Sequence, residues 1–363
     1  MTKTHHPYAA ARQDSTLVNV TQLAEFDEVI DVRSEAEFAE DHVPGAISCP
    51  VLSDAERARV GAIYKQESAF DAKKIGAALV SRNIARHLEA SFAGRPRSWR
   101  PLVYCWRGGS RSGALAHVLQ QVGWRAGRLD GGYKAYRRAV IADLHERPPQ
   151  FKWRVICGLT GSGKSRLLRA LAQRGSQVLD LEALAAHRGS VLGNLPGAPQ
   201  PSQKMFESRV WAELRKFDAA PPVWVEAESK KIGSVRVPET LIAAMWNGEC
   251  IRLDASVSLR DAMLTDEYQH FVSDPALLGT QLDCLVAHYG QDRIGAWKRL
   301  ASAGEWDALV RELLESHYDP AYTRSTLKHY PHHADGMRLE VTADSDAAFD
   351  GLAAQCLKAM ALA

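Results

Sequence analysis

The chain has 363 residues, which is too long for one ordinary hydrophobic core and predicts two domains. With 46% hydrophobic and 24% charged residues it has the composition of a soluble globular protein, and no apolar run approaches the length needed to cross a bilayer, which excludes a membrane-spanning helix. A formal net charge of +2 neither demands nor excludes nucleic acid, because a local basic patch can bind phosphates.

The first fifteen residues are polar and contain no apolar core, so they predict neither a signal peptide nor an anchor. We therefore expect a cytoplasmic protein with no membrane partner. Six cysteines are spread along the chain without a C-x-x-C pair, which argues against a zinc site or a dithiol redox motif. Since cytosolic thiols stay reduced, each cysteine is expected to be a small buried hydrophobe unless its local sequence argues otherwise.

Residues 16–146 alternate short apolar strands with helices and are expected to form the first domain. The expected strands include 29–32, 102–104 and a segment near 128–130. The expected helices cover 54–90, 110–122 and 133–145. This alternation predicts an α/β fold with a mostly parallel sheet.

A thiol lies between the expected strand 102–104 and the expected helix 110–122. The loop that joins them reads Cys105-Trp106-Arg107-Gly108-Gly109-Ser110-Arg111. It would lift Cys105 to the carboxyl edge of the sheet, where the amides of Gly108, Gly109 and Ser110 and the helix N-terminus would form an anion nest. The positive charge of Arg107 and Arg111 would add to a field that favours the thiolate. Cys105 is therefore the candidate nucleophile, with the two arginines as its candidate catalytic partners.

The same spacing, Cys105-x5-Arg111 followed by Ser112, also occurs in loops of the tyrosine-phosphatase type. A phosphatase needs a general acid on a nearby loop, and the sequence does not identify one. The spacing alone therefore leaves a phosphatase-like loop and a chalcogen carrier both open.

Residues 146–150 predict a linker, because the tandem Pro148-Pro149 stops a helix and cannot continue a sheet. The second domain is expected over 152–363 as a P-loop NTPase-like α/β domain. Its expected strands are 153–157, 178–181, 223–226, 250–253 and 337–341. A helix is expected at 165–174 and a helical portion over about 258–330.

Residues 158–165 (GLTGSGKS) match the phosphate-loop pattern G-x-x-x-x-G-K-[ST] between a strand and a helix. The candidate phosphate-binding residues are Gly158, Gly161, Ser162, Gly163, Lys164 and Ser165. The glycines let backbone N–H groups cradle phosphate oxygens, Lys164 reaches the terminal phosphate, and the Ser165 hydroxyl can face Mg²⁺. The pattern predicts a phosphate-bearing ligand, which need not be a nucleotide.

A nucleotide-hydrolysing enzyme also needs an acidic residue at the end of another strand to hold magnesium. The candidates are Asp180, Glu182, Glu226 and Glu228, and none is expected to end a strongly apolar strand. His187 and Arg188, in the segment 187–190, belong either to a loop that closes over substrate phosphates or to a structural turn. No tightly bound cofactor is expected.

Several segments resemble a rhodanese domain in order and spacing. They are 30–38 (IDVRSEAEF), 42–46 (HVPGA), the Cys105 loop and 130–135 (DGGYKA). A rhodanese domain followed by a P-loop domain resembles one family, the bacterial tRNA 2-selenouridine synthases. Further blocks that agree are 56–66 (ERARVGAIYKQ), 180–190 (DLEALAAHRGS), 228–233 (ESKKIG) and 318–322 (YDPAY). The chain departs from the family at Ala227, where the family has Asp, which argues against a magnesium role for that position.

The resemblance implies a transferase that replaces sulfur by selenium in the wobble 2-thiouridine of the tRNAs for Lys, Glu and Gln. It implies selenophosphate as the selenium donor and Cys105 as the residue that carries selenium as a perselenide. It also implies geranylation of the 2-thiouridine by geranyl diphosphate, which turns the sulfur into a leaving group. The loop 158–165 would then hold a diphosphate.

A tRNA anticodon stem-loop would require local positive charge. Two stretches combine basic and aromatic residues: 82–100, with Trp99, and 134–138, with Tyr136. Arginine and aromatic planes can stack on a splayed base, although each residue taken singly is more simply explained by a solvated helix face.

Two other classes of function compete with this interpretation. An ATP-dependent rhodanese-type sulfurtransferase acting on tRNA would show nucleotide turnover that depends on Lys164. A regulatory module, whose inactive phosphatase-like loop binds a phosphorylated partner, would not need Cys105. The sequence does not determine the oligomeric state.

Overall fold

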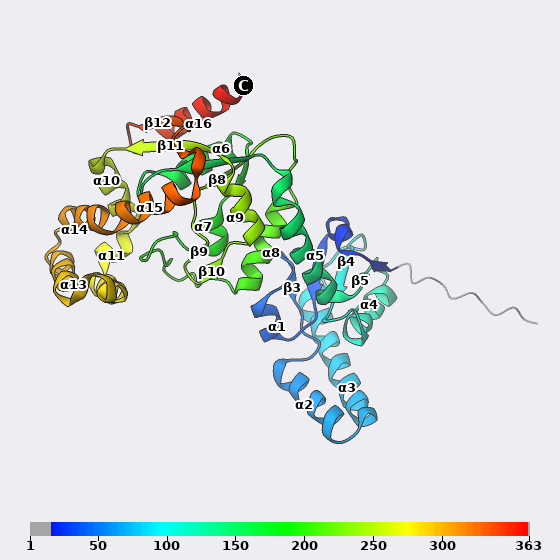
Figure 1. The fold of residues 1–363 in the computed structure, drawn as a ribbon. Coiled ribbons are helices and arrows are strands. Elements are labelled where there is room, and N and C mark those ends of the chain that lie inside the picture. Colours follow the sequence, from blue (N-terminus) through cyan, green and yellow to red (C-terminus); the bar gives the residue numbers. More distant parts are fainter. Residues whose placement is uncertain (1–15, 362–363) are drawn as a thin grey trace, which may run out of the picture. The chain divides into compact units, whose positions relative to one another are not determined.

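The computed structural model describes residues 16–361, and the chain divides between Ala142 and Asp143 into two compact units (Figure 1). The polar segment 1–15 lies outside the described residues. Between residues 16 and 361, no helix is both long and apolar enough to span a membrane. Each unit is an α/β structure built on its own parallel sheet, which confirms the expected fold class.

The first unit is built on a five-stranded parallel sheet in the order β1-β5-β4-β2-β3. Its strands are β1 (Leu17–Val18), β2 (Glu28–Asp31), β3 (Ile47–Ser48), β4 (Pro101–Tyr104) and β5 (Gly127–Leu129). Its helices are α1 (Glu35–Glu40), α2 (Asp54–Gln66), α3 (Ala69–His87), α4 (Ser110–Val122) and α5 (Gly132–Glu146), the last of which continues past Ala142. All four residues of the central strand β4 are buried, as a strand covered by helices on both faces requires.

Local signals explain where several helices of this unit begin and end. α2 begins with a capping box, in which Ser53 and Glu56 each bond the other's backbone N–H. α4 ends at Gly123, whose φ of 107° only glycine adopts readily. The core between sheet and helices contains Ile30, Val103 and Leu115, together with Trp99 at 4% exposure.

The second unit has a five-stranded parallel sheet in the order β12-β11-β6-β8-β7, with β6 in the centre. Its strands are β6 (Trp153–Cys157), β7 (Gln177–Leu179), β8 (Val223–Glu226), β11 (Glu249–Ala255) and β12 (Met337–Val341). A separate antiparallel hairpin pairs β9 (Lys231–Ile232) with β10 (Val235–Arg236). The accompanying helices are α6 (Lys164–Gln173), α7 (Leu181–Ala185), α8 (Gln203–Leu214), α9 (Glu239–Trp246) and α16 (Asp346–Ala361).

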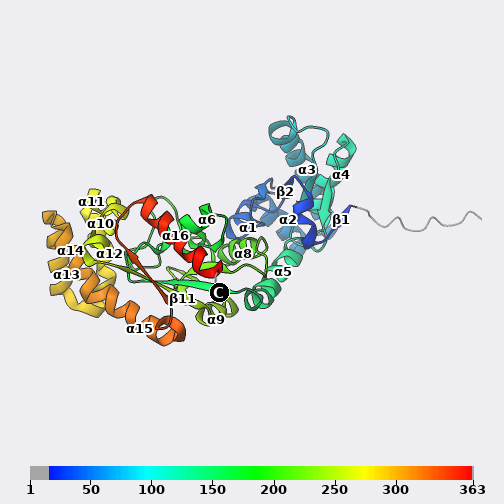
Figure 2. The ribbon, with the colours of Figure 1, turned by 90° about the horizontal axis from the view of Figure 1, so that it is seen from above.

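The expected helical portion forms one end of the second unit (Figures 1 and 2). It consists of α10 (Val257–Glu267), α11 (Gln269–Ser273), α12 (Pro275–Leu282), α13 (Val286–Ala303), α14 (Trp306–Leu313), a π-helical turn (Leu314–Tyr318) and α15 (Asp319–His329). These helices have a hydrophobic cluster of their own, with Leu282 and Trp297 fully buried. From this end, α15 leads the chain back to the edge strand β12.

The cysteines follow the expected pattern with one exception. Cys49, Cys105, Cys157, Cys250 and Cys356 are buried free thiols. Cys284 is exposed, because it lies in the short turn between α12 and α13 rather than in a core-facing position.

Candidate functional site

The thiol loop lies at the carboxyl end of β4, between that strand and the first turn of α4. Cys105 is 3% exposed, and its Sγ is 3.2 Å from the Ser112 hydroxyl oxygen. Gly108, with a φ of 68°, adopts the left-handed conformation that turns the loop toward the helix. In parallel sheets, ligand-binding residues characteristically follow the carboxyl ends of the strands. Cys105 thus lies where the sequence predicts it, at the carboxyl edge of the sheet.

Residues at the start of α5 fix the backbone of this loop. The Tyr133 N–H donates to the Cys105 carbonyl at 2.8 Å, and the Lys134 N–H donates to the Trp106 carbonyl at 3.1 Å. Gly132 allows this approach, because a Cβ there would lie 2.2 Å from the Cys105 carbonyl oxygen and 2.5 Å from the Gly108 nitrogen. Gly132 of the 130–135 block is thus required by close backbone contact with the thiol loop.

A buried ionic network supports these contacts. No role was predicted for its residues from the sequence. Arg33 is 1% exposed and pairs with Asp31 at 2.6 Å. Its guanidinium also donates to the Asp41 carbonyl and lies 3.9 Å from the centroid of the Tyr133 ring. The Tyr133 hydroxyl in turn donates to the Asp41 carboxylate at 2.7 Å. Each buried charge therefore has a partner, and the network holds Tyr133 against the thiol loop.

The two arginines of the loop differ in their surroundings. Arg107 is exposed, whereas Arg111 is partly buried and lies 3.3 Å from the Glu37 carboxylate. Burial raises the pKa of Glu37, but the Ser34 amide and Arg111 outweigh burial and hold that pKa below its usual value. Glu37 is thus a counter-charge to Arg111, which the prediction of a purely positive loop overlooked.

The phosphate loop follows β6 and leads into α6, as its motif predicts. Gly161 and Gly163 have φ values of 79° and 84°, and a Cβ on Gly163 would lie 2.3 Å from the Phe349 ring. Lys164 donates from Nζ to the Gly158 carbonyl at 2.9 Å. Ser162 is 1% exposed. The six predicted residues thus belong to one turn whose shape only glycines at these positions permit.

The helical portion supplies contacts to the phosphate loop that sequence reasoning missed. The Gly158 N–H donates to the Tyr322 hydroxyl at 2.6 Å, and the Lys164 ammonium lies 5.3 Å from the centroid of the Tyr322 ring. Arg260, at 1% exposure, donates to the Thr160 carbonyl at 2.8 Å and pairs with Asp319 at 2.5 Å. Asp319 and Tyr322 belong to the 318–322 block, so the resemblance of that block to the family was the one sequence signal for these contacts.

Three of the four candidate carboxylates meet beside Ser165. Oxygens of Glu182, Glu226 and Glu228 lie within 4.8 Å of one another. The Ser165 hydroxyl is 3.3 Å from Glu182 and 3.2 Å from Glu226. The fourth candidate, Asp180, caps α7 by accepting from the Ala183 N–H at 2.8 Å.

The expectation that no candidate ends a strongly apolar strand is wrong for Glu226. All four residues of β8 are buried, and β8 pairs directly with the phosphate-loop strand β6. The sequence of β8 does not read as strongly apolar, because Trp224 occupies a position where such strands usually have an aliphatic residue. In the structure Trp224 is nevertheless only 1% exposed.

The carboxylate cluster is electrostatically unfavourable without a cation. Burial, and then repulsion from Glu228, raises the pKa of Glu182 to about 8, while burial and Glu226 raise the pKa of Glu228 to about 8. Burial and Glu182 raise the pKa of Glu226 well above its usual value, although the Lys164 charge opposes the shift in all three groups. Carboxylate and hydroxyl oxygens are the ligands that Mg²⁺ prefers. The donor set therefore fits a magnesium ion held by these residues and Ser165.

Residues 187–190 lie over the carboxylate cluster. Arg188 pairs with Glu267 at 3.2 Å and lies 4.7 Å from the centroid of the Tyr268 ring. Gly189, with a φ of 66°, comes so close that a Cβ there would lie 2.8 Å from a Glu182 oxygen. His187 is 4% exposed and packs against Gly193, and burial lowers its pKa. His187 is therefore a packing residue, whereas 188–190 line the site.

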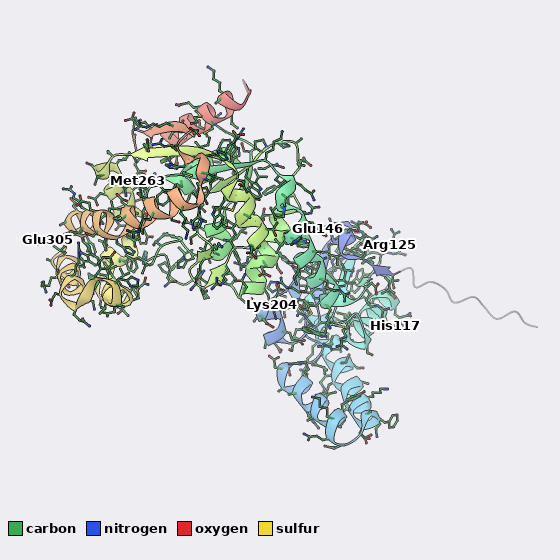
Figure 3. All side chains as sticks on the ribbon, viewed as in Figure 1. His117, Arg125, Glu146, Lys204, Met263 and Glu305 are labelled. Carbon is green, nitrogen blue, oxygen red and sulfur yellow. The ribbon has the colours of Figure 1, made fainter. Side chains whose placement is uncertain are left out.

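The phosphate loop, residues 188–190, Glu228 and the aromatic residues of 318–330 enclose a cavity of about 620 Å³. Met263 of α10, labelled in Figure 3, forms part of its wall. The cavity brings Lys164, Ser165, Glu182 and Glu228 to one space that is large enough for a diphosphate with an organic substituent.

Removal of divalent metal should make the stability of the protein depend on pH. Carboxyl groups with a pKa near 8 when folded and about 4.3 when unfolded bind more protons in the folded state between these values, so stability falls as pH rises through this window. With EDTA, we expect the melting temperature to fall by about 10 °C or more between about pH 5.5 and about pH 8.5. Glu228→Gln should flatten this slope, whereas Glu315→Gln, at an exposed position, should not.

Magnesium should raise the melting temperature more at the higher pH, because the metal binds the deprotonated carboxylates. The same Mg²⁺-dependent increase in Glu228→Gln as in the unsubstituted protein would contradict the assignment of Glu228 to the metal site.

The two basic stretches contribute exposed charge but not the expected stacking surfaces. Arg82, Arg97 and Lys134 are exposed. Trp99 is 4% exposed and packs edge-on against Trp124, and Tyr136 is fully buried. Both aromatic residues belong to the core, because each lies on the inner side of its segment, and neither can stack on a base.

Two family models match the chain. The model of the rhodanese-like domain matches residues 16–139, and that of the tRNA 2-selenouridine synthase AAA domain matches residues 151–277. The chain is 36% identical to the tRNA 2-selenouridine synthase of Nitrosomonas europaea over 66% of this chain and 63% of that protein. It is 35% identical to the enzyme of the same name from Aeromonas salmonicida (75% and 73% covered) and to that from Bdellovibrio bacteriovorus (82% and 88% covered).

Proposed function

The chain belongs to the tRNA 2-selenouridine synthase family, and from this premise we propose that it converts the wobble 2-thiouridine of tRNA to 2-selenouridine in two steps. The observation that carries the proposal is that the chain has two chemically different anion-binding loops. One presents the thiol of Cys105, and the other presents Lys164 beside a carboxylate cluster. Neither loop duplicates the chemistry of the other.

In the first proposed step, the 2-thiouridine sulfur attacks C1 of geranyl diphosphate. A carbon–sulfur bond forms, the carbon–oxygen bond breaks, and diphosphate leaves. Lys164 and the amides of 158–165 stabilise the charge that develops on the leaving group. When Mg²⁺ is bound by Ser165 and the carboxylates, it neutralises further charge on the diphosphate.

In the second proposed step, selenium replaces the geranylated sulfur, which leaves as geranyl thiol. Selenophosphate is a tetrahedral anion, and the loop of Gly108, Gly109 and Ser110 at the start of α4 is suited to bind it. We propose that Cys105 carries selenium as a perselenide, formed when selenophosphate selenium displaces a small thiol from a mixed disulfide at Cys105 and water then releases phosphate. The perselenide selenium attacks C2 of the base as geranyl thiol leaves, and the small thiol then attacks the Cys105 sulfur, which frees 2-selenouridine and restores the mixed disulfide. Arg107 is exposed at the same loop and can contact an incoming anion.

The proposed macromolecular substrate is the anticodon stem-loop of the tRNAs for Lys, Glu and Gln, which places the reaction in the cytoplasm. Exposed arginine and lysine side chains of 82–100 and 134–138 supply positive charge for the phosphate backbone. Because Trp99 and Tyr136 are buried, this contribution is electrostatic and should weaken as salt concentration rises.

Mass spectrometry of nucleosides tests the proposal directly. We expect tRNA that contains 2-thiouridine to yield the geranylated nucleoside with the protein and geranyl diphosphate alone. Addition of selenophosphate should convert it to 2-selenouridine, whereas selenophosphate without geranyl diphosphate should give no product. Selenouridine formed at full rate without a prenyl donor would contradict the two-step order.

A second candidate function is an ATP-dependent rhodanese-type sulfurtransferase. The position of Glu226 favours it, because a buried acidic residue on the strand beside the phosphate loop is typical of enzymes that hydrolyse nucleotides. In this case the same experiment would require ATP, and no geranylated nucleoside would appear.

A further inference from the structure

A second, apolar cavity adjoins the phosphate cavity within the second unit. Its volume is about 60 Å³. Thr160, Leu264, Tyr268 and Tyr318 line both cavities, so the two share a wall beside the phosphate loop. Thr160 itself lies inside the loop 158–165, two residues after Gly158.

The remaining lining of the apolar cavity is almost entirely hydrocarbon. It comes from α10, α11, α12 and α14, the helices at the end of the unit where Figure 3 labels Glu305, together with Leu192 and Leu314. Its inner residues include Phe271, Leu278, Leu309 and Leu313, each at most 5% exposed. Tyr268 contributes its ring to the wall, while its hydroxyl lies 3.3 Å from the Ser190 hydroxyl.

The arrangement combines a charged end and an apolar end in the order that an amphiphilic phosphate ester requires. Phosphates bound at 158–165 would lie beside Thr160, and a substituent directed past Thr160 and Leu264 would meet hydrocarbon. A nucleoside would gain little in this cavity, because a ribose and a base need hydrogen-bond partners that such a wall does not offer. A short hydrocarbon chain needs none.

We propose that this cavity binds the prenyl chain of the prenyl diphosphate donor, an inference that rests on the proposed function. The diphosphate occupies the phosphate loop, and the chain extends between Thr160 and Leu264 toward Phe271 and Leu309. The cavity is small, with Leu278 of α12 and Leu309 and Leu313 of α14 in its wall, so we expect it to select a short chain. Arg260 fixes the position of Thr160 at the entrance between the two cavities, because it donates to the Thr160 carbonyl and forms an ion pair with Asp319 on α15.

Binding affinities of three ligands test the proposal: inorganic diphosphate, geranyl diphosphate and the longer farnesyl diphosphate. For the unsubstituted protein we expect geranyl diphosphate to bind about tenfold or more tightly than diphosphate, because burial of a few methylene groups suffices for that factor. Farnesyl diphosphate should bind no more tightly than geranyl diphosphate, because its extra carbons exceed the cavity.

Val310→Trp and Val272→Trp should each fill the cavity from its partly exposed side. Both variants should bind inorganic diphosphate normally but lose the preference for geranyl diphosphate. Val257→Trp, on α10 but outside the cavity lining and 40% exposed, should keep that preference. Melting curves establish that each variant is folded.

The outcomes separate this inference from the proposed function. If the unsubstituted protein prefers geranyl diphosphate and both filled variants keep the preference, the chain binds elsewhere and the inference fails, while the proposed function stands. If the unsubstituted protein shows no preference, the prenyl donor itself is wrong and both fail. A geranyl diphosphate analogue with a diazirine at the end of its chain tests the unsubstituted protein independently. It should label peptides of α11, α12 or α14, and labelling confined to other segments would overturn the inference.

Discussion

Cys105→Ala is expected to abolish selenium insertion while geranylation continues, so that the geranylated nucleoside accumulates. Prenyl transfer needs no protein nucleophile, because the thiouridine sulfur itself attacks the prenyl carbon. Selenium delivery needs the carrier thiol, and alanine has none. Nucleoside mass spectrometry with both donors present should therefore show no selenouridine and a build-up of its geranylated precursor.

The variant should remain folded. Cys105 is 3% exposed, but alanine removes only the sulfur atom and its contact with the Ser112 hydroxyl, a loss of about 1 kcal/mol in unfolding free energy. The backbone bonds from Tyr133 and Lys134 do not depend on the side chain of residue 105. tRNA binding should be nearly unchanged for the same reason.

Cys49→Ala is the matched control, because Cys49 is a second buried cysteine of the same unit, also 3% exposed. Burial raises the pKa of the Cys49 thiol to about 12, so that thiol stays protonated and is not a nucleophile at neutral pH. Near-normal selenouridine formation by Cys105→Ala, or its loss in Cys49→Ala, would contradict the carrier role of Cys105.

The two loops could be predicted from the sequence because their determinants are local. In each, a buried strand, a glycine-containing turn and a helix follow one another within about a dozen residues. The bounds of α4, β6 and β8 agree with the expected segments for the same reason. Segments without such signals, including α8, α16 and the β9–β10 hairpin, were not predicted, because only tertiary contacts show which of their faces is buried.

The carboxylate site could be predicted only as a set of candidates. Glu182 lies in the first turn of α7, Glu226 ends β8, and Glu228 follows it, so the order of strands decides which of them meet Ser165. Asp180 does not join this site, because its carboxylate caps α7 instead. Arg260 and Tyr322 were missed because they reach the phosphate loop from helices 100 and 164 residues away in sequence.

Lys164→Ala is expected to block geranylation, and selenium insertion with it, because the second step acts on the product of the first. Lys164 is a cation of the phosphate loop itself, and its Nζ lies 2.9 Å from the Gly158 carbonyl oxygen at the start of that loop. Without this charge, the diphosphate leaving group loses an electrostatic partner at the moment its negative charge develops. We expect the rate of geranylation to fall by about a hundredfold or more, the usual effect of removing one such group.

Lys216→Ala provides the control, because it removes the same charge from an exposed lysine of the same unit that pairs only with Glu213 in the described structure. Supplying tRNA already geranylated at the 2-thiouridine sharpens the test further. Lys164→Ala should convert this tRNA to the selenouridine form at a near-normal rate, because the step then proceeds without a diphosphate, whereas Cys105→Ala should not convert it. Geranylation that survives in Lys164→Ala, or that is lost in Cys105→Ala, would show that the roles of the two loops are wrongly assigned. An ATP-dependent sulfurtransferase would instead lose all activity in both variants, since its single activation sequence would need both groups.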